Sequence, residues 1–268
     1  MISVTIMAHP KRDALVADLL TYLDPSVTRV VWDEKDDVWD TGERSIFSYH
    51  PEASHHLVIQ DDAVPCRDLL MGVEEMVKHT GDHLVSLYMG RPRPHPALVS
   101  LRIKLAKRMG HSYVDMPGPL WGVGILFPVG LIREMESASD LRSGSSRYDV
   151  RIARFLRMRG MSCLYTVPSL VDHRVGRDNP SLFPGKDHER RAWEFIGEEV
   201  SATSVDWSLI PPEELPLFLE WENGKRSSFL CTKCGHHVVV KKRMEEHLKF
   251  HERIKASRSG RRWNKNGR

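Results

Sequence analysis

Four potential metal ligands near the C-terminus constrain the fold of this chain more than any other feature of its sequence. They follow the pattern Cys231-x2-Cys234-x12-His247-x3-His251. Two cysteines this close fit a tight turn between two short strands, and two histidines four residues apart lie on one face of a helix. Two thiolates and two imidazoles together favour tetrahedral coordination of Zn2+. We therefore expect these four side chains to bind one Zn2+.

Three apolar residues are spaced so that they could form a small core around that metal. Phe229 lies two residues before the first cysteine, Val238 four after the second, and Met244 three before the first histidine. With the ligands, they resemble the two-cysteine, two-histidine zinc finger family over its whole length, with Val and Met replacing the usual aromatic and leucine. The resemblance implies a small C-terminal ββα zinc finger at residues 227–255, which gains most of its folding free energy from the metal.

The C-terminal region is also far more basic than the rest of the chain. Residues 225–268 contain 14 Lys and Arg against 3 Glu, a net charge of +11, whereas the remaining residues contain 25 basic and 33 acidic side chains, a net charge of −8. A basic segment attracts phosphate or another acidic surface, and an acidic one is a poor general binder of nucleic acid. We expect residues 256–268, rich in Arg, Ser, Gly and Asn, to form a basic tail that is disordered until it binds a partner.

The zinc finger family pattern implies a nucleic-acid contact through Lys241, Lys242 and Arg243. A lone finger buries too little surface for strong sequence specificity, although the basic tail could add phosphate contacts. Three roles stay open for the finger: a nucleic-acid tether, a protein-docking module and a structural cap. The charge favours the first of them.

The region before the finger alternates strand-like and helix-like patterns, which predicts an α/β domain over residues 1–210. Pro211-Pro212 and Asn223-Gly224 break regular structure, so residues 211–226 are predicted to be a linker. The predicted strands are Ile2–Ala8, Thr28–Trp32, His56–Ile59, His83–Tyr88 and Ser162–Val167, and the predicted helices are Pro10–Leu23, Asp68–His79, Arg102–Met109 and Tyr148–Arg159.

Neither a secretion signal nor a membrane helix is indicated. The first residues have no basic region ahead of an apolar stretch, and the longest apolar run, Leu120 to Ile132, is too short to span a bilayer. We therefore expect a cytoplasmic protein with no membrane partner. Because disulfides are rare in the cytoplasm, Cys66 and Cys163 are predicted to be buried thiols.

Paired acids follow one of the predicted strands. The apolar strand His56–Ile59 is followed by Gln60, Asp61 and Asp62. In open α/β folds, the carboxyl ends of strands form the edge at which ligands bind, and carboxylate oxygens there suit a hard divalent cation. Taken alone, an Asp-Asp pair after a strand is more often a turn or a helix cap than a metal site.

Several short segments, taken in order, strengthen the metal interpretation. They are Ile6-Met7-Ala8-His9-Pro10, Val30-Val31-Trp32-Asp33, Gln60-Asp61-Asp62, Pro119-Leu120-Trp121-Gly122, Tyr148-Asp149 and Pro168-Ser169-Leu170-Val171-Asp172-His173-Arg174. They resemble the GT-A class of glycosyltransferases, particularly enzymes encoded by bacteriophages, over residues 1–184. The resemblance implies an α/β fold with a GT-A-like (Rossmann-like) mixed sheet flanked by helices. For a phage-encoded enzyme, the location would be the host cytoplasm.

The resemblance also implies residue roles. Asp62 and His173 would bind Mn2+ or Mg2+, and Asp149 would be the general base for an acceptor hydroxyl. Gln60 stands where the family's metal motif is often acidic, which gives Asp62 more weight and leaves Asp61 as a supporting ligand or ribose contact. The residues implied in binding the nucleotide-sugar donor are His9, Arg12, Asp33, Asp61, Trp121, Gly122 and Arg174.

The acceptor is left open by the sequence, and a protein, a glycan or DNA would each fit. Ordinary structural roles compete with the implied ones: His173 could be a surface histidine, Asp149 a helix N-terminal residue and Trp121 a core side chain. The alternative function is a nucleic-acid-binding zinc-finger protein with a non-catalytic or nucleotidyltransferase-like α/β body. A third class is an interaction adaptor without chemistry.

Overall fold

The computed structural model describes most of the first 210 residues and short parts of the remainder. The described ranges are 1–91, 96–116, 118–138, 141, 147–175, 190–210, 218–223, 226–231, 237–238, 244–246 and 248–249. The chain divides into two compact units, Met1–Pro211 and Pro212–Arg268.

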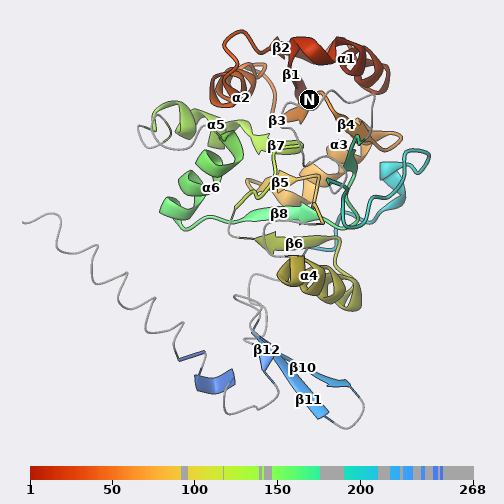
Figure 1. Cartoon of the computed structure of the whole chain (residues 1–268), viewed down its shortest axis with the longest axis vertical. Helices are drawn as coiled ribbons and strands as arrows, with labels where there is room; N and C mark the ends of the chain where they lie inside the picture. Colours follow the sequence, from red (N-terminus) through yellow and green to blue (C-terminus); the bar gives the residue numbers. More distant parts are fainter. Residues whose placement is uncertain are drawn as a thin grey trace, which may run out of the picture. The chain divides into compact units, whose positions relative to one another are not determined.

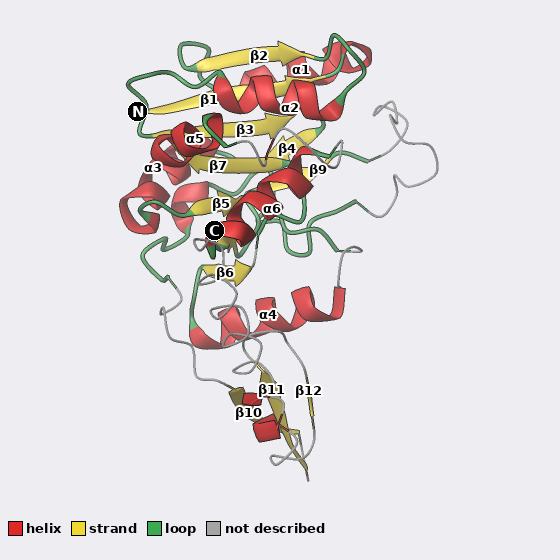
Figure 2. Ribbon diagram, turned by 90° about the vertical axis from the view of Figure 1, so that its left-hand side faces the viewer, coloured by secondary structure: helices red, strands yellow, loops and turns green. Residues whose placement is uncertain are grey.

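The described strands of the first unit form a seven-stranded mixed sheet in the order β2-β1-β3-β7-β5-β8-β6 (Figure 2). Strands β1, β2 and β3 are parallel, β7 is antiparallel to β3 and β5, β8 is parallel to β5, and β6 is antiparallel to β8. Strands β4 and β9 form a separate antiparallel pair. The bounds are β1 Ile2–Ala8, β2 Thr28–Trp32, β3 His55–Gln60, β4 Ala63–Pro65, β5 Leu84–Ser86, β6 Tyr113–Met116, β7 Gly124–Pro128, β8 Cys163–Thr166 and β9 Val171–His173.

Helices cover both faces of this sheet, with α1 and α3 on one side and α2, α5 and α6 on the other (Figure 1). Among the described residues, no helix combines the length and the apolar character needed to cross a membrane. The helices are α1 Asp13–Leu19, α2 Val38–Phe47, α3 Leu69–Thr80, α4 Pro96–Met109, α5 Val129–Glu136 and α6 Tyr148–Arg159, with short 3-10 turns at Pro10–Arg12, Leu20–Tyr22 and Ala202–Ser204.

The core consists of two apolar layers separated by the sheet. Successive side chains of a strand point to opposite faces, so Leu57 and Ile59 of β3 pack under α1 and α3 while Val58 packs under the other helices. All three are fully buried. Central strands buried on both faces read as continuous apolar runs, which is why β3 is detectable in the sequence.

The predicted α/β class with a mixed, helix-flanked sheet is confirmed, and most predicted elements lie within a few residues of their expected bounds. The predicted helix Pro10–Leu23 forms as the short α1 with a 3-10 turn at each end. The apolar run Leu120 to Ile132 contains the central strand β7 and the start of α5. Cys66 and Cys163 are buried free thiols, as predicted.

His56 provides a test of the fold through its response to acid. Its Nδ1 lies 2.8 Å from Ser3 Oγ and its Nε2 lies 2.9 Å from the Ser45 carbonyl oxygen. Burial, partly offset by these contacts, lowers the pKa of His56 to about 4. Because the unfolded ring titrates near 6.5, this contribution to stability is present above that pH and is lost as the pH falls towards 4.

We expect the free energy of unfolding to drop by up to about 3 kcal/mol between pH 6.5 and 4 on account of this one ring. When the free energy of unfolding is measured by urea titration across that range, it should change less steeply with pH for His56→Gln than for the native chain. His50→Gln, at a partly exposed position between α2 and β3, is the matched control and should keep the native slope. Equal slopes for all three proteins would contradict the prediction.

In the second unit, the described strands form an antiparallel sheet in the order β10-β11-β12. Their bounds are Phe218–Asn223, Arg226–Cys231 and His237–Val238. Strand β10 lies inside the predicted linker, residues 211–226, so that segment is not irregular throughout. The register places Phe229 opposite Val238, and Met244 is buried. The small apolar core of the finger stays a prediction.

Candidate functional site

The carboxyl ends of three parallel strands bring the predicted site residues to one edge of the sheet. Strand β1 leads into His9, β2 into Asp33 and β3 into Asp61-Asp62. The antiparallel strand β7 starts at the same edge, with Gly124 opposite Ile59. The loop carrying Trp121 and Gly122 therefore meets the ends of β1–β3, where ligands bind in open α/β sheets.

The two acids at the end of β3 are buried and share one arginine. Asp61 and Asp62 are 4% and 2% exposed. The Arg12 guanidinium Nη1 donates to Asp61 Oδ1 at 2.8 Å and to Asp62 Oδ2 at 2.7 Å. The His9 backbone N–H donates to Asp61 Oδ2 at 2.7 Å. The turn after β1 thus fixes both carboxylates, and Arg12, predicted to bind the donor, contacts the acidic pair.

The single positive charge of the Arg12 guanidinium does not fully neutralise the negative charges of two adjacent buried carboxylates. Burial and the negative charge of Asp62 raise the pKa of Asp61 to about 6, although Arg12 and the His9 N–H both act to lower it. An additional cation at this edge would relieve the remaining repulsion between the two carboxylates.

His173 reaches the same pair from a distant part of the sequence. Strand β9 pairs with β4 so that His173 lies opposite Ala63, immediately after Asp62. Its Nε2 is 3.2 Å from Asp62 Oδ2, and the backbone N–H of Arg174 donates to the Asp62 carbonyl oxygen at 2.7 Å. Asp62 and His173, the two predicted ligands of the divalent cation, are therefore adjacent and buried.

The donor set at this point fits a divalent cation. His173 Nδ1 lies 2.9 Å from the Arg174 carbonyl oxygen, which can only accept, so Nδ1 carries a proton. In the neutral ring, Nε2 then presents a lone pair to Asp62 Oδ2. Adjacent ligands of an octahedral ion with bonds of about 2.1 Å lie roughly 3 Å apart, which matches the observed separation of these two atoms.

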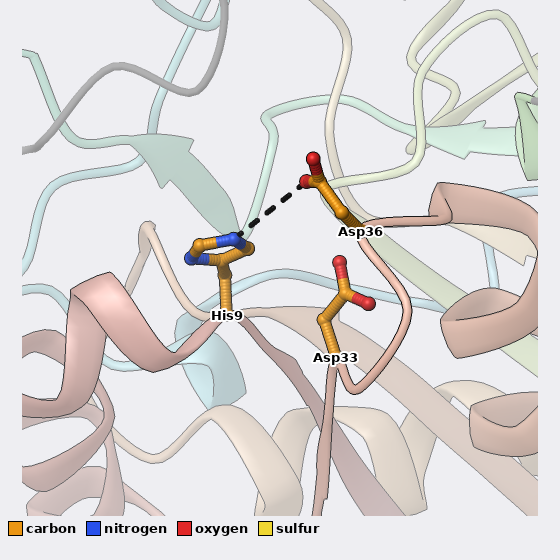
Figure 3. A group of neighbouring side chains, drawn as sticks. All are labelled: His9, Asp33 and Asp36. Carbon is orange, nitrogen blue, oxygen red and sulfur yellow. Dashed lines mark ion pairs between the residues drawn. The ribbon is translucent and has the colours of Figure 1, made fainter.

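A second group of potential ligands lies beside the first, at the ends of β1 and β2. His9, Asp33 and Asp36 each offer an atom within 4.8 Å of the others (Figure 3). Here, however, His9 Nδ1 accepts a hydrogen bond from the Lys11 N–H at 3.1 Å, so the neutral ring presents an N–H at Nε2, 4.0 Å from Asp36 Oδ1. This group suits hydrogen bonding to a polar ligand better than binding of a cation.

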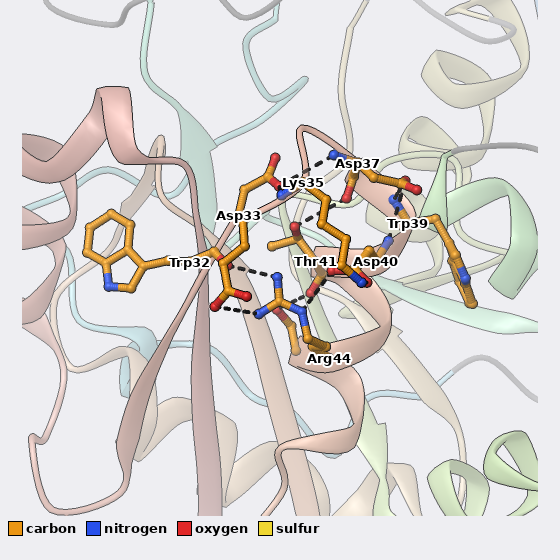
Figure 4. Close-up of polar contacts among 10 residues, drawn as sticks. Trp32, Asp33, Lys35, Asp37, Trp39, Asp40, Thr41 and Arg44 are labelled. Carbon is orange, nitrogen blue, oxygen red and sulfur yellow. Dashed lines mark hydrogen bonds and ion pairs between the residues drawn. The ribbon is translucent and has the colours of Figure 1, made fainter.

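The turn after β2 holds Asp33 in place. Asp33 Oδ1 accepts from the backbone N–H groups of Lys35 and Asp37, at 3.1 and 3.4 Å, and Asp37 caps α2. Arg44 of α2 donates back to the carbonyl oxygen of Trp32 at 2.9 Å (Figure 4). Strand, turn and helix are thus tied together, so Asp33 is fixed by a local network.

Three aromatic side chains, Trp121, Tyr88 and Tyr165, pack together near this edge of the sheet. Trp121 makes edge-to-face contacts with Tyr88 and Tyr165, with ring centroids 6.0 and 6.1 Å apart. Trp121 is partly exposed, whereas both tyrosines are buried. A Cβ at Gly90 would lie 2.9 Å from the Trp121 ring, so Gly90 leaves room for the indole. This geometry combines core packing with a partly exposed aromatic edge.

The glycine after Trp121 has a clear packing reason. A Cβ at Gly122 would lie far inside van der Waals contact of the Tyr148 ring, and the Tyr148 hydroxyl donates to the Gly122 carbonyl oxygen. The resemblance implies a donor contact at Gly122; in the structure, the space beside its Cα is filled by Tyr148. The donor contact of Gly122 stays a prediction, with this packing role beside it.

Asp149 lies next to that tyrosine, in the first turn of α6. It is 6% exposed, and its Oδ2 accepts from Arg147 Nη2 at 2.7 Å. Burial raises the pKa of Tyr148 well above its usual value, and the charges of Asp149 and Asp62 raise it further. Both carboxylates are therefore within electrostatic reach of the same phenol. The general-base role of Asp149 stays a prediction.

Two other residues at this edge carry no role in the sequence analysis. Asp172 is buried, and its carboxylate accepts from Arg191 Nη1 at 2.8 Å and from the Ala192 N–H at 2.6 Å. A cavity of about 610 Å3 adjoins it, with Arg91 and Trp193 also in its lining. An acid directly before a predicted ligand was the available signal for Asp172. The second residue without a predicted role is Asp36, and the run of acids after β2 was the available signal for it.

The zinc ligands fall almost entirely outside the described residues. Cys231 ends strand β11, while Cys234, His247 and His251 are not described. The predicted nucleic-acid contacts Lys241, Lys242 and Arg243 also lie outside the described residues. Zinc binding and nucleic-acid binding stay predictions from the sequence.

Fold and site together define an α/β protein in which buried acids and a histidine meet at one edge of a mixed sheet. No protein-family model and no curated protein sequence matches the chain. Among solved structures, it is similar to the Drosophila β1,4-galactosyltransferase 7, a mutant in complex with manganese, UDP-Gal and xylobiose. The identity is 9%, the match covers 76% of this chain and 84% of that one, and the TM-score is 0.40. At this level of similarity, nothing about activity follows.

Proposed function

We propose that this protein is a glycosyltransferase that moves a sugar from a nucleotide-sugar donor to an acceptor with the help of Mn2+ or Mg2+. The observation that carries the proposal is the convergence, at one sheet edge, of the buried pair Asp62–His173, the guanidinium of Arg12 and the partly exposed ring of Trp121. A bound cation would offset the charge that develops on the departing diphosphate.

The roles of the individual side chains follow from their chemistry. Asp62 and His173 would hold the cation, with Asp61 supporting Asp62. Arg174, whose guanidinium pairs with Asp18 of α1, lies beside the ligands and would bind phosphate oxygens. His9 and Asp33 offer an N–H and a carboxylate that suit the hydroxyls of a ribose. The aromatic edge of Trp121 would contact a sugar ring, and Asp149 would accept the proton of the acceptor hydroxyl.

Nucleotide release from a panel of donors tests this function. Purified full-length protein is incubated with uridine- and guanosine-linked sugars, with Mn2+, with Mg2+ or with a chelator, and with candidate protein, glycan and DNA acceptors. Release of nucleotide that needs the cation, with mass gain on one acceptor, supports the proposal. Absence of both turnover and cation-dependent nucleotide binding across the panel would refute it.

Asp149→Asn should separate catalysis from binding. If Asp149 takes up the acceptor proton, kcat falls by roughly 100- to 10,000-fold while the affinities for donor and Mn2+ stay within about threefold of the native values. Arg147→Gln is the matched control, because it removes the neighbouring charge and leaves the carboxylate. A native kcat for Asp149→Asn would exclude Asp149 as the base.

The second unit is proposed to bind zinc and to tether the enzyme to a nucleic acid or a protein partner. The charge of residues 225–268 favours nucleic acid. A gel-shift titration against salt tests this, since phosphate contacts predict a shift that weakens steeply as the salt concentration rises. A shift that is absent or independent of salt would leave only the protein-docking and structural roles.

A further inference from the structure

The proposed cation ligand Asp62 contacts a positive charge supplied by the chain itself. Arg12 Nη1 lies 2.7 Å from Asp62 Oδ2, the same oxygen that faces His173 Nε2. The arginine side chain is 8% exposed, and Asp61 and Asp62 are more deeply buried still. A guanidinium this well buried between two carboxylates is a component of the site.

A guanidinium and a divalent cation cannot both share this oxygen without repulsion. Charges in a buried site are weakly screened, so two cations that contact one carboxylate oxygen oppose each other strongly. Binding of the ion to Asp62 and His173 is therefore expected to require Arg12 to move or to acquire a further anionic partner.

The proposed donor would supply that partner. A diphosphate presents several anionic oxygens, and a planar guanidinium binds such oxygens in bidentate fashion. Arg12 lies in the short turn Pro10–Arg12 directly after β1, at the edge where the donor is proposed to bind. Movement of its side chain alone would leave the backbone N–H of His9 bonded to Asp61 and so leave the acidic pair in place.

We propose that Arg12 is an internal counter-cation that occupies Asp62 until a nucleoside diphosphate draws it away, so that the divalent cation and the nucleotide bind with positive coupling. The inference rests on the proposed function, because it takes the donor diphosphate as the ligand of Arg12. In addition to the donor contact predicted from the sequence, Arg12 would then make binding of the cation depend on binding of the nucleotide.

The coupling is measured from the Mn2+ affinity of the full-length, zinc-saturated protein. Free Mn2+ is followed by electron paramagnetic resonance with and without saturating UDP, with correction for the Mn2+–UDP complex in solution. For the native chain, we expect weak binding of Mn2+ alone and a gain of about tenfold with UDP, within the range of roughly 5- to 150-fold typical of coupled sites.

Arg12→Gln should bind Mn2+ alone about tenfold more tightly than the native chain and gain less from UDP than the native chain does, because only the direct contact between cation and diphosphate remains. Lys11→Gln, which removes the same charge from the exposed neighbouring residue, should behave like the native chain. The thermal midpoint of Arg12→Gln is expected to fall, because two buried carboxylates lose their counter-charge, and Mn2+ should restore it more than it raises the native midpoint.

Two failures are distinguishable. Arg12→Gln that binds Mn2+ as weakly as the native chain, while Asp62→Asn abolishes binding in both backgrounds, would overturn the role of Arg12 and keep the cation site. Native protein that binds no Mn2+ with or without UDP would overturn the proposed function itself. If Arg12→Gln is unfolded without Mn2+, recovery of its circular dichroism on addition of Mn2+ supports the inference, and a lack of recovery refutes it.

Discussion

Asp62→Asn is expected to lower cation-dependent nucleotide release by about a thousandfold. The substitution keeps the shape of the side chain but removes the charge that would bind the cation beside His173. A metal ion at a departing phosphate contributes several kcal/mol to transition-state stabilisation, and each 1.4 kcal/mol corresponds to about a tenfold change in rate. The measurement is kcat/KM for the donor at saturating Mn2+, together with the Mn2+ affinity, which should fall in parallel.

The matched control for this prediction is Asp82→Asn. Asp82 is an exposed aspartate in the turn between α3 and β5, at the opposite edge of the sheet, and its replacement should leave kcat/KM within about twofold. Cys231→Ala, which removes a predicted zinc ligand in the second unit, should also spare activity. A native rate for Asp62→Asn would show that Asp62 is not a cation ligand, whatever its contacts.

Gly122→Ala is expected to destabilise the first unit by about 3 kcal/mol. The added methyl group would overlap the ring of Tyr148, which is buried and cannot retreat into solvent. Overpacking of this kind costs about 1–3 kcal/mol, and here the displaced ring also loses its hydrogen bond to the Gly122 carbonyl oxygen. For a unit of about 200 residues, this corresponds to a drop of roughly 6–12 °C in the thermal midpoint.

Gly130→Ala is the contrasting control. A Cβ at Gly130 meets nothing within 4 Å, and the residue is exposed in α5. Because alanine favours helix over glycine, this substitution should be neutral or stabilise the unit by up to about 1 kcal/mol. Equal stability of the two variants, measured by urea unfolding, would mean that Tyr148 moves freely and that the packing argument for Gly122 is wrong.

The sequence predicted the parts of the fold that depend on local pattern. Strands β1 and β2 and helix α6 have the predicted bounds, because each combines a clear apolar periodicity with a turn residue at its end. Once those strands are parallel, His9, Asp33 and Asp61 necessarily share an edge. The site could therefore be located from short-range information.

What the sequence could not supply is the set of pairings between distant residues. Arg12 is recognisable as a cation near the end of β1, but its bonds to both Asp61 and Asp62 depend on the register of β1 against β3. Helix α2 is capped by Asp37 and was missed because the turn before it is a run of charged residues. Asp172 was recognisable only as a neighbour of His173, since its partner Arg191 follows much later in the chain.

The β4–β9 pairing has a consequence for how the protein is made. It joins Ala63 to His173, so a nascent chain that has been synthesised only as far as β8 contains both aspartates and no histidine opposite them. During that interval, the emerging polypeptide already contains Arg12, which pairs with both acids in the complete structure. On the proposed function, the cation site would therefore be completed late, when β9 pairs with β4.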